Sequence, residues 1–419
     1  MMAFPLNPSL KSFCSDESGG IAIMFGLMSL GIMMFAGVAL DYSRVNHERS
    51  RVTAALDAAA LAAGKALLDG RLTDTEVQQR ARAYFEQNVK AAQRFGSVES
   101  FDVQIDRATS GVQVNAAVAL PMTLTRLMGI DNVVFPVSAS AKFEQQDIEL
   151  SLALDVTGSM AGSKIAALKA AAQDLFDILL PDAGTPNKVR IALAPYSSGV
   201  NAGVYAATAT GLAAPARGCT FEREGPDKVD DSAPEAGNYF KAIGSSGIVR
   251  GASCPSAARV VALTNDKDVL RTEVQSYSVG GSTAGHLGAQ WAWNLISPNW
   301  GGVFTGDNTP VSYGDRKTLK VMIVMTDGRF NTFAGQNLGD NSSTARRSSK
   351  LAVAACEGAR DKGIAVYTIG FQLDDPQATQ TLKDCAGNDR NFYAAATGEE
   401  LREVFKSIAE QIISLRLSS

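Results

Sequence analysis

The second half of the chain predicts an α/β fold, in which buried parallel strands alternate with helices. Four short apolar runs predict strands that are buried on both faces: residues 148–154, 189–194, 319–325 and 364–371. Four other segments space their apolar residues as helices do: residues 164–180, 344–361, 376–385 and 398–415. This alternation predicts a Rossmann-like domain with a parallel sheet over residues 148–419.

The composition limits the class of protein. A chain of 419 residues is long enough for two or more domains. It is 46% hydrophobic and 20% charged, and its net charge of −4 offers no basic surface for nucleic acid. Two histidines and five cysteines, none of them in a CxxC or HExxH arrangement, argue against zinc and thiol-redox chemistry.

An uncharged segment at residues 18–40 precedes the predicted α/β domain. At 1.5 Å per residue it would form a helix of about 34 Å, which is enough to cross a bilayer. We expect an uncleaved transmembrane anchor that follows a short cytoplasmic segment at residues 1–17. A signal peptide is the alternative, but the apolar run is long for one and no Ala-x-Ala site closes it.

Two further regions lie between the anchor and the α/β domain. Apolar residues continue on one helical face after the anchor, so we expect the helix to extend as a stalk over residues 41–70. Residues 71–143 begin with a helical pattern and then alternate apolar and polar residues, as strands do. They predict a small α+β domain.

The α/β domain contains a long segment that is rich in Gly, Ala, Pro and Ser, at about residues 197–264. It is too long for an ordinary loop, so we interpret it as an insertion. Cys219 and Cys254 lie in it and are expected to form a disulfide that staples it. Cys356 and Cys385, on or next to predicted helices, could form a second one.

Two observations disagree about the side of the membrane on which the large domain lies. Three arginines follow the anchor and one lysine precedes it, which by the positive-inside rule favours the cytoplasm, although large domains translocate largely regardless of charge. The cysteines favour the opposite side. Only Cys14 precedes the anchor, and the even set of four after it fits two disulfides in an oxidising compartment. Four buried thiols are the alternative.

Three oxygen-bearing side chains follow the first strand of the α/β domain. Asp155, Thr157 and Ser159 occupy alternate positions between that strand and the next helix. In parallel sheets, ligands bind outside the carboxyl ends of the strands. Carboxylate and hydroxyl oxygens are suitable ligands for a hard cation, so this loop predicts a site for Mg²⁺, or for Mn²⁺ or Ca²⁺.

This loop resembles the metal-ion-dependent adhesion site of von Willebrand factor A domains, whose signature is Asp-x-Ser-x-Ser. In that family a threonine after a glycine turn and an aspartate in a Thr-Asp-Gly loop complete the site. Thr283 follows a Gly-Gly-Ser turn, and Asp327 stands in Thr-Asp-Gly, so both positions match. The resemblance implies an A domain whose metal binds an acidic residue of a partner protein, without catalysis.

Nearly the whole chain resembles the TadG-like proteins of the Flp (tight-adherence, Tad) pilus-assembly system. The likeness is carried by the Gly-Ile-Ala-Ile-Met-Phe run at 20–25, the Tyr-Thr-Ile-Gly-Phe run at 367–371 and the closing residues 412–418. It implies a single-pass protein of the bacterial inner membrane with a periplasmic A domain. Such a protein would help to assemble or anchor an adhesive pilus, with other pilus-assembly or envelope proteins as its partners.

Two other functions stay open. Asp155-Val-Thr-Gly resembles weakly the Asp-Lys-Thr-Gly loop of phosphatases that use the aspartate as a nucleophile. Valine replaces the lysine here, and the chain has no GxxxxGK[ST] loop, so we do not expect an enzyme. Alternatively, the A domain is a purely structural scaffold in which Asp155 caps the following loop.

Overall fold

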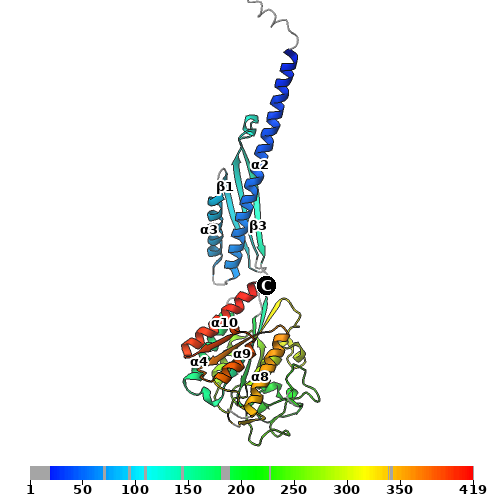
Figure 1. Cartoon of the computed structure of the whole chain (residues 1–419), viewed down its shortest axis with the longest axis vertical. Coiled ribbons are helices and arrows are strands. Elements are labelled where there is room, and N and C mark those ends of the chain that lie inside the picture. Colours follow the sequence, from blue (N-terminus) through cyan, green and yellow to red (C-terminus); the bar gives the residue numbers. More distant parts are fainter. Residues whose placement is uncertain are drawn as a thin grey trace, which may run out of the picture. The chain divides into compact units, whose positions relative to one another are not determined.

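The computed structural model describes residues 19–68, 72–92, 96–107, 111–142, 146–180, 189–225, 228–337, 339 and 343–418. The N-terminal segment predicted at residues 1–17, with Cys14, lies outside the described residues. The chain divides into two compact units, residues 1–144 and 145–419 (Figure 1).

The N-terminal unit is organised around α2 (Gly19–Leu68), one continuous helix (Figure 1). Its first half exposes large apolar side chains, and the helix is long and apolar enough to span a membrane. Its second half buries one face of small apolar residues in the core of the unit, among them Leu56, Ala59 and Ala63. The same helix therefore supplies both an apolar span and a packed stalk.

A three-stranded antiparallel sheet and helix α3 (Asp74–Ala92) complete this unit. Strands β1 (Ser97–Asp106), β2 (Gly111–Pro121) and β3 (Asn132–Lys142) pair in the order β1-β2-β3. Strand β2 alternates buried with more exposed residues, because only one face of the sheet packs against the helices. The turn between β2 and β3 contains a short 3₁₀ helix, η1 (Thr125–Met128).

The second unit is built on an eight-stranded sheet with a parallel centre. Strand β4 (Asp147–Asp155) lies between β5 (Val189–Tyr196) and β9 (Thr318–Thr326), and β12 (Ala365–Phe371) and β13 (Phe392–Ala395) continue the sheet beyond β9. Helices cover both faces, which is why the central strands are buried almost throughout. The predicted α/β fold class is confirmed.

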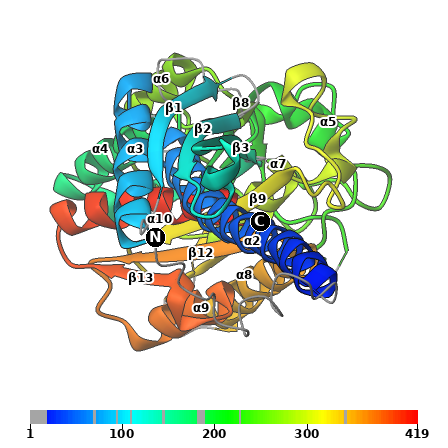
Figure 2. The ribbon, with the colours of Figure 1, turned by 90° about the horizontal axis from the view of Figure 1, so that it is seen from above.

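The helices of this unit form two layers (Figure 2). One layer contains α4 (Ser163–Leu179), α6 (Lys267–Ser276) and α10 (Gly398–Ser418). The other contains α7 (Gly285–Leu295), α8 (Ser343–Asp361) and α9 (Pro376–Ala386). Every residue of α7 is buried, because this helix packs on the centre of the sheet and is itself covered by α8.

The segment predicted as an insertion, residues 197–264, is partly integrated into the sheet. Strands β6 (Val200–Asn201) and β7 (Cys219–Thr220) extend the sheet beyond β5. Strand β8 (Val261–Thr264) also pairs with β5, in antiparallel direction, so the inserted part ends before residue 261. The predicted insertion, given as about residues 197–264, includes this strand as well as β6 and β7.

Both predicted disulfides are present. Cys219 and Cys254 are bonded, with Cα atoms 5.5 Å apart, and they close the inserted segment on itself. Cys356 and Cys385 are bonded with Cα atoms 5.0 Å apart, and they join α8 to the end of α9. The alternative of four buried thiols is thereby excluded for the structure described.

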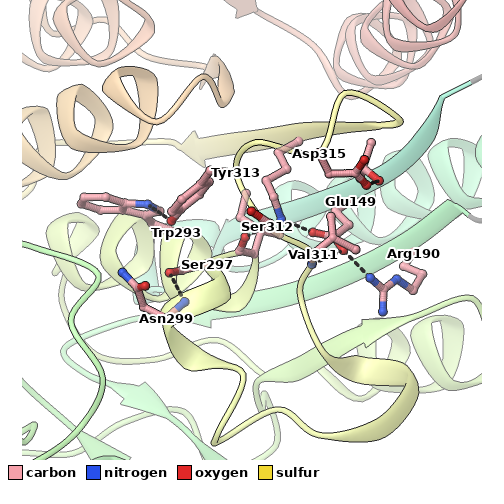
Figure 3. Close-up of polar contacts among 12 residues, drawn as sticks. Glu149, Arg190, Trp293, Ser297, Asn299, Val311, Ser312, Tyr313 and Asp315 are labelled. Atoms are coloured by element: carbon pink, nitrogen blue, oxygen red, sulfur yellow. Dashed lines mark hydrogen bonds and ion pairs between the residues drawn. The ribbon is translucent and has the colours of Figure 1, made fainter.

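A buried ion network surrounds Glu149, near the start of β4 (Figure 3). Glu149 is 1% exposed, and its two carboxylate oxygens accept hydrogen bonds from Arg190 and Lys320. The Val311 N–H also donates to Glu149 Oε1 at 2.9 Å, and Lys320 donates to Ile296 O at 2.9 Å. Burial lowers the pKa of Lys320, although the charge of Glu149 opposes this effect. Two cations thus enclose one carboxylate.

Candidate metal centre

Asp155 is the last residue of β4 and lies at the carboxyl edge of the sheet, where its side chain is fully buried. The Thr157 N–H donates to Asp155 Oδ1 at 2.9 Å, and the Thr326 hydroxyl donates to Oδ2 at 2.7 Å. Within the described residues, no ion pair joins Asp155 to a cationic side chain. Both of its oxygens are therefore held by neutral donors alone.

A chain of oxygen atoms connects the loop after β4 to the end of β9. Thr157 Oγ1 and Ser159 Oγ lie 2.9 Å apart, and the Ser159 hydroxyl donates to Asp327 Oδ1 at 2.6 Å. Asp327 directly follows β9. The structure thus brings Asp155, Thr157, Ser159 and Asp327 together, as the loop order of the sequence predicts.

Lys164 is a member of this cluster that the sequence analysis misses. It lies in the first turn of α4, and its Nζ donates to Asp327 Oδ2 at 2.8 Å. The Lys164 side chain is 22% exposed, whereas that of Asp327 is 0% exposed. Its spacing of five residues after Ser159, at a predicted helix start, was the available signal.

The loop that contains Thr283 contacts the loop after β4 through its backbone. The Gly158 N–H donates to Gly281 O at 3.0 Å, which joins the glycine turn to the loop after β4. Thr283 is buried, and its N–H donates to Asn331 Oδ1 at 3.0 Å. In the part of the chain that the structure describes, no hydrogen bond joins the Thr283 hydroxyl to the other four side chains.

The charges of the cluster are unbalanced. Two carboxylates, Asp155 and Asp327, face one ammonium group, Lys164, so one negative charge is not compensated. Burial, and after it the charge of Asp327, raises the pKa of Asp155 to about 6. The Asp155 carboxylate therefore carries its charge at neutral pH at an energetic cost that a nearby cation would relieve.

Two distances between oxygen atoms of the cluster are compatible with ligands of a hard divalent cation. Around an octahedral Mg²⁺ with bonds of about 2.0–2.1 Å, neighbouring ligand oxygens lie about 3 Å apart. The distances from Thr157 to Ser159, 2.9 Å, and from Ser159 to Asp327, 2.6 Å, are close to this spacing. The residues present thus fit the metal that the A-domain resemblance implies.

A second buried polar group has the connectivity of a catalytic triad. His286 Nδ1 lies 2.7 Å from Ser348 Oγ, and His286 Nε2 lies 2.9 Å from Glu222 Oε1. His286 and Glu222 line a cavity of about 310 Å³, but Ser348 is fully buried and does not line it. A substrate in the cavity would not reach the hydroxyl, so this group holds α7, α8 and the inserted segment together.

The comparison with protein families concerns the N-terminal helix. Residues 19–66 match the family described as "Putative Flp pilus-assembly TadE/G-like". The predicted resemblance to the TadG-like proteins is confirmed for this segment. The TadE/G-like segment falls within α2 and includes both its apolar span and most of its packed stalk. No curated protein matches the sequence.

Solved structures with similar folds include domains of pilus proteins. The von Willebrand factor domain of Mfa5, the type V pili tip protein of Porphyromonas gingivalis, is 14% identical, with a TM-score of 0.41 over 66% of this chain and 97% of that one. The pilus adhesin SpaC of Lactobacillus rhamnosus GG is 12% identical, with a TM-score of 0.40 over 77% and 35%. Manganese-loaded TRAP of Plasmodium vivax is 13% identical, with a TM-score of 0.32 over 64% and 74%.

Proposed function

We propose that this protein is a membrane-anchored component of Flp/Tad pilus assembly or anchoring, and that it binds partner proteins through a divalent metal ion. The TadE/G-like segment supports the pilus system, and its exposed apolar half supports the anchor. We also propose that the α/β unit lies in the periplasm, because two disulfides are typical of an oxidising compartment.

The uncompensated negative charge at the carboxyl edge of the sheet carries this proposal. Asp155 and Asp327 would hold the ion, with Thr157, Ser159 and Thr283 as neutral neighbours that leave much of its charge unneutralised. Bound there, Mg²⁺ supplies a positive charge that attracts an anionic ligand, and we propose a carboxylate of a partner protein in that role. The site is thus proposed to bind and not to catalyse.

Metal binding is tested by calorimetric titration of the full-length protein in detergent with Mg²⁺ and Mn²⁺. We expect heat of binding for the wild type and none for Asp155→Ala. Asp361→Ala, an exposed carboxylate at the end of α8, is the matched control and should behave as the wild type. Equal heats for the wild type and Asp155→Ala would contradict the proposal.

The biological role is tested by returning the same variants to a strain that lacks the gene. We expect Asp155→Ala to reach the membrane in normal amount and to assemble few pili, as counted by electron microscopy. Asp361→Ala should restore normal pili. Normal piliation with Asp155→Ala would show that pilus assembly does not need metal binding at this site.

A purely structural α/β scaffold is the second candidate, and one contact favours it. Lys164 already neutralises Asp327, so the cluster holds a cation without any metal. In that case neither Mg²⁺ nor Mn²⁺ would give heat of binding, and Asp155→Asn would support normal pilus assembly.

A further inference from the structure

The turn between β2 and β3 exposes several large apolar side chains next to one another. Leu127 is 87% exposed and Met128 is 54% exposed, and Leu124 and Ile130 beside them are also exposed. We call these four residues the hairpin tip. Turns at protein surfaces are normally polar, and a contiguous exposed apolar patch marks a surface that contacts something else.

The hairpin tip packs against the end of the apolar half of α2. A Cβ atom at Gly37 would lie 2.9 Å from Leu124 Cβ, so the absence of a side chain at Gly37 allows the turn to touch the helix. Gly37 lies in the last helical turn of the uncharged run that ends at Leu40. Figure 1 shows the turn before β3 beside α2 within this unit.

Asp41, one helical turn after Gly37, attaches the turn between β2 and β3 to α2. Its carboxylate accepts hydrogen bonds from the N–H groups of Thr123, Leu124 and Thr125, at 2.8–3.3 Å, and from the Thr125 hydroxyl at 3.0 Å. These bonds, led by the one from the Thr125 N–H, lower the pKa of Asp41 to about 2 although burial opposes them. The attachment therefore persists throughout the neutral pH range.

We propose that the hairpin tip inserts into the surface of the same membrane that α2 crosses, as a second lipid contact of the protein. The inference rests on the proposed membrane anchor. Apolar side chains of the tip continue the apolar surface of α2, and exposed Tyr42 and half-buried Arg44 follow on the helix, as is typical of a membrane interface. Lipid is therefore the occupant that this surface fits.

The polar groups of the turn are compatible with this position. Arg126 and Asp131 pair with each other at 3.1 Å, and both are largely exposed, so they can reach the headgroups. The backbone is also satisfied locally, because Gly129 N–H donates to Arg126 O at 3.0 Å and Ile130 N–H donates to Thr125 O at 3.3 Å. The charges of Arg126 and Asp131 therefore do not have to enter the hydrocarbon when the tip does.

Two lipid contacts restrict the orientation of the protein in the membrane more than a single contact does. A single helix can rotate about its axis and tilt in the bilayer, because only its length is matched to the membrane. A second contact on one side of α2 fixes which way the sheet of the N-terminal unit faces. The hairpin tip would thus orient the surface that this unit presents to its neighbours in the membrane.

The test measures the depth of single nitroxide labels in the full-length protein, reconstituted into vesicles of phosphatidylethanolamine and phosphatidylglycerol. Leu127→Cys is made in a Cys14→Ser background, because the other four cysteines are paired. Phe35→Cys on α2 reports the anchor. Leu61→Cys, an exposed position about 39 Å further along α2 than Phe35 at 1.5 Å per residue, is the aqueous control.

We expect the ratio of oxygen to nickel-chelate accessibility at position 127 to exceed that at position 61 several-fold and to approach that at position 35. Met128→Cys should give the same result, which guards against a local disturbance at Leu127. A position 127 as aqueous as position 61, with position 35 in lipid, overturns the inference and leaves the anchor intact. If position 35 is also aqueous, both the inference and the proposed anchor are wrong.

Discussion

Strand β4 carries two buried carboxylates on the same face, and their surroundings are opposite. Near its start, Glu149 contacts two cations, Arg190 and Lys320, in a closed network (Figure 3). At its end, Asp155 contacts only neutral donors and faces a second carboxylate, Asp327. The strand and the depth of burial are shared, so the difference lies in the charges that the neighbouring elements supply.

This difference separates a structural carboxylate from one that is available for binding. A buried charge is stable only when it is paired, or when its ionisation is made difficult by a shift of its pKa. Glu149 is paired, so its charge is used within the fold. The pKa of Asp155 is raised to about 6, which shows that the fold leaves its charge without a full partner. Such a carboxylate is the one expected to take up a cation from solution.

The largest effect on stability is expected at Glu149, the carboxylate that is paired with two cations. Glu149→Ala would leave the ammonium of Lys320 and the guanidinium of Arg190 without their carboxylate, and Lys320 is only 5% exposed. We expect a loss of about 3–5 kcal/mol in the free energy of unfolding. Urea denaturation followed by tryptophan fluorescence measures it. Asp155→Ala should lower the free energy of unfolding far less, because it leaves no cation without its partner. Equal losses for the two variants would contradict the proposed difference between Glu149 and Asp155.

The second effect is the pH dependence of metal affinity and of stability, which we expect at Asp155, the carboxylate without a cationic partner among the described residues. Because Asp155 has a pKa near 6, a metal ion must displace a proton from it at pH 5 but hardly at pH 7. Affinity for Mg²⁺ should therefore fall about tenfold from pH 7 to pH 5. Without metal, the raised pKa means that stability decreases as pH rises from about 4 to about 6. Calorimetry at pH 5 and pH 7 tests whether the affinity for Mg²⁺ is lower at pH 5. Thermal melting of the metal-free protein between about pH 4 and about pH 6 tests whether its stability decreases as the pH rises.

A smaller effect is expected at Lys164. Its ion pair with Asp327 is partly exposed and so is worth about 1 kcal/mol, and a metal ion has to weaken or displace it. Lys164→Met should raise the affinity for Mg²⁺ about fivefold and lower the stability of the metal-free protein. Lys169→Met, on the same helix but bonded to the Gln275 carbonyl, should change neither. Unchanged affinity in Lys164→Met would show that the ammonium and the ion do not compete.

The smallest effect is expected of Thr157→Ser, and Thr157→Val is its contrast. Thr157→Ser keeps the hydroxyl that lies 2.9 Å from Ser159, so its affinity for Mg²⁺ should stay within about twofold of the wild type. Thr157→Val keeps the shape but removes the oxygen, and should weaken binding about tenfold or more. Titration of both variants distinguishes a ligand from a packing residue, and equal affinities would remove Thr157 from the proposed site.

The elements that the sequence predicts well are those whose signal is local. Strands β4 and β9 are unbroken apolar runs because both faces are buried, and the spacing of Asp155, Thr157 and Ser159 lies within one loop. Both disulfides also followed from counting and placing the cysteines. In these cases one short stretch of sequence contains the whole physical cause.

The features that the sequence analysis misses depend on distant partners. Asp41 looks like the first polar residue after an apolar run, and its role appears only when Thr125, 84 residues away, donates to it. Lys164 looks like an ordinary helix residue until Asp327 is placed beside it. Strand β8 has four residues and depends on β5 for its identity. Tertiary contacts decide these cases.

Strand β4 also has a mechanical consequence. Its first residue, Asp147, follows the N-terminal unit in the chain, and its last residue is Asp155. A partner held at Asp155 and a helix held in the membrane would pull this strand from opposite ends. Its hydrogen bonds to β5 and β9 run across that direction, so they would be loaded together in shear and would not open one after another. The strand that presents the proposed metal site is therefore suited to bear tension.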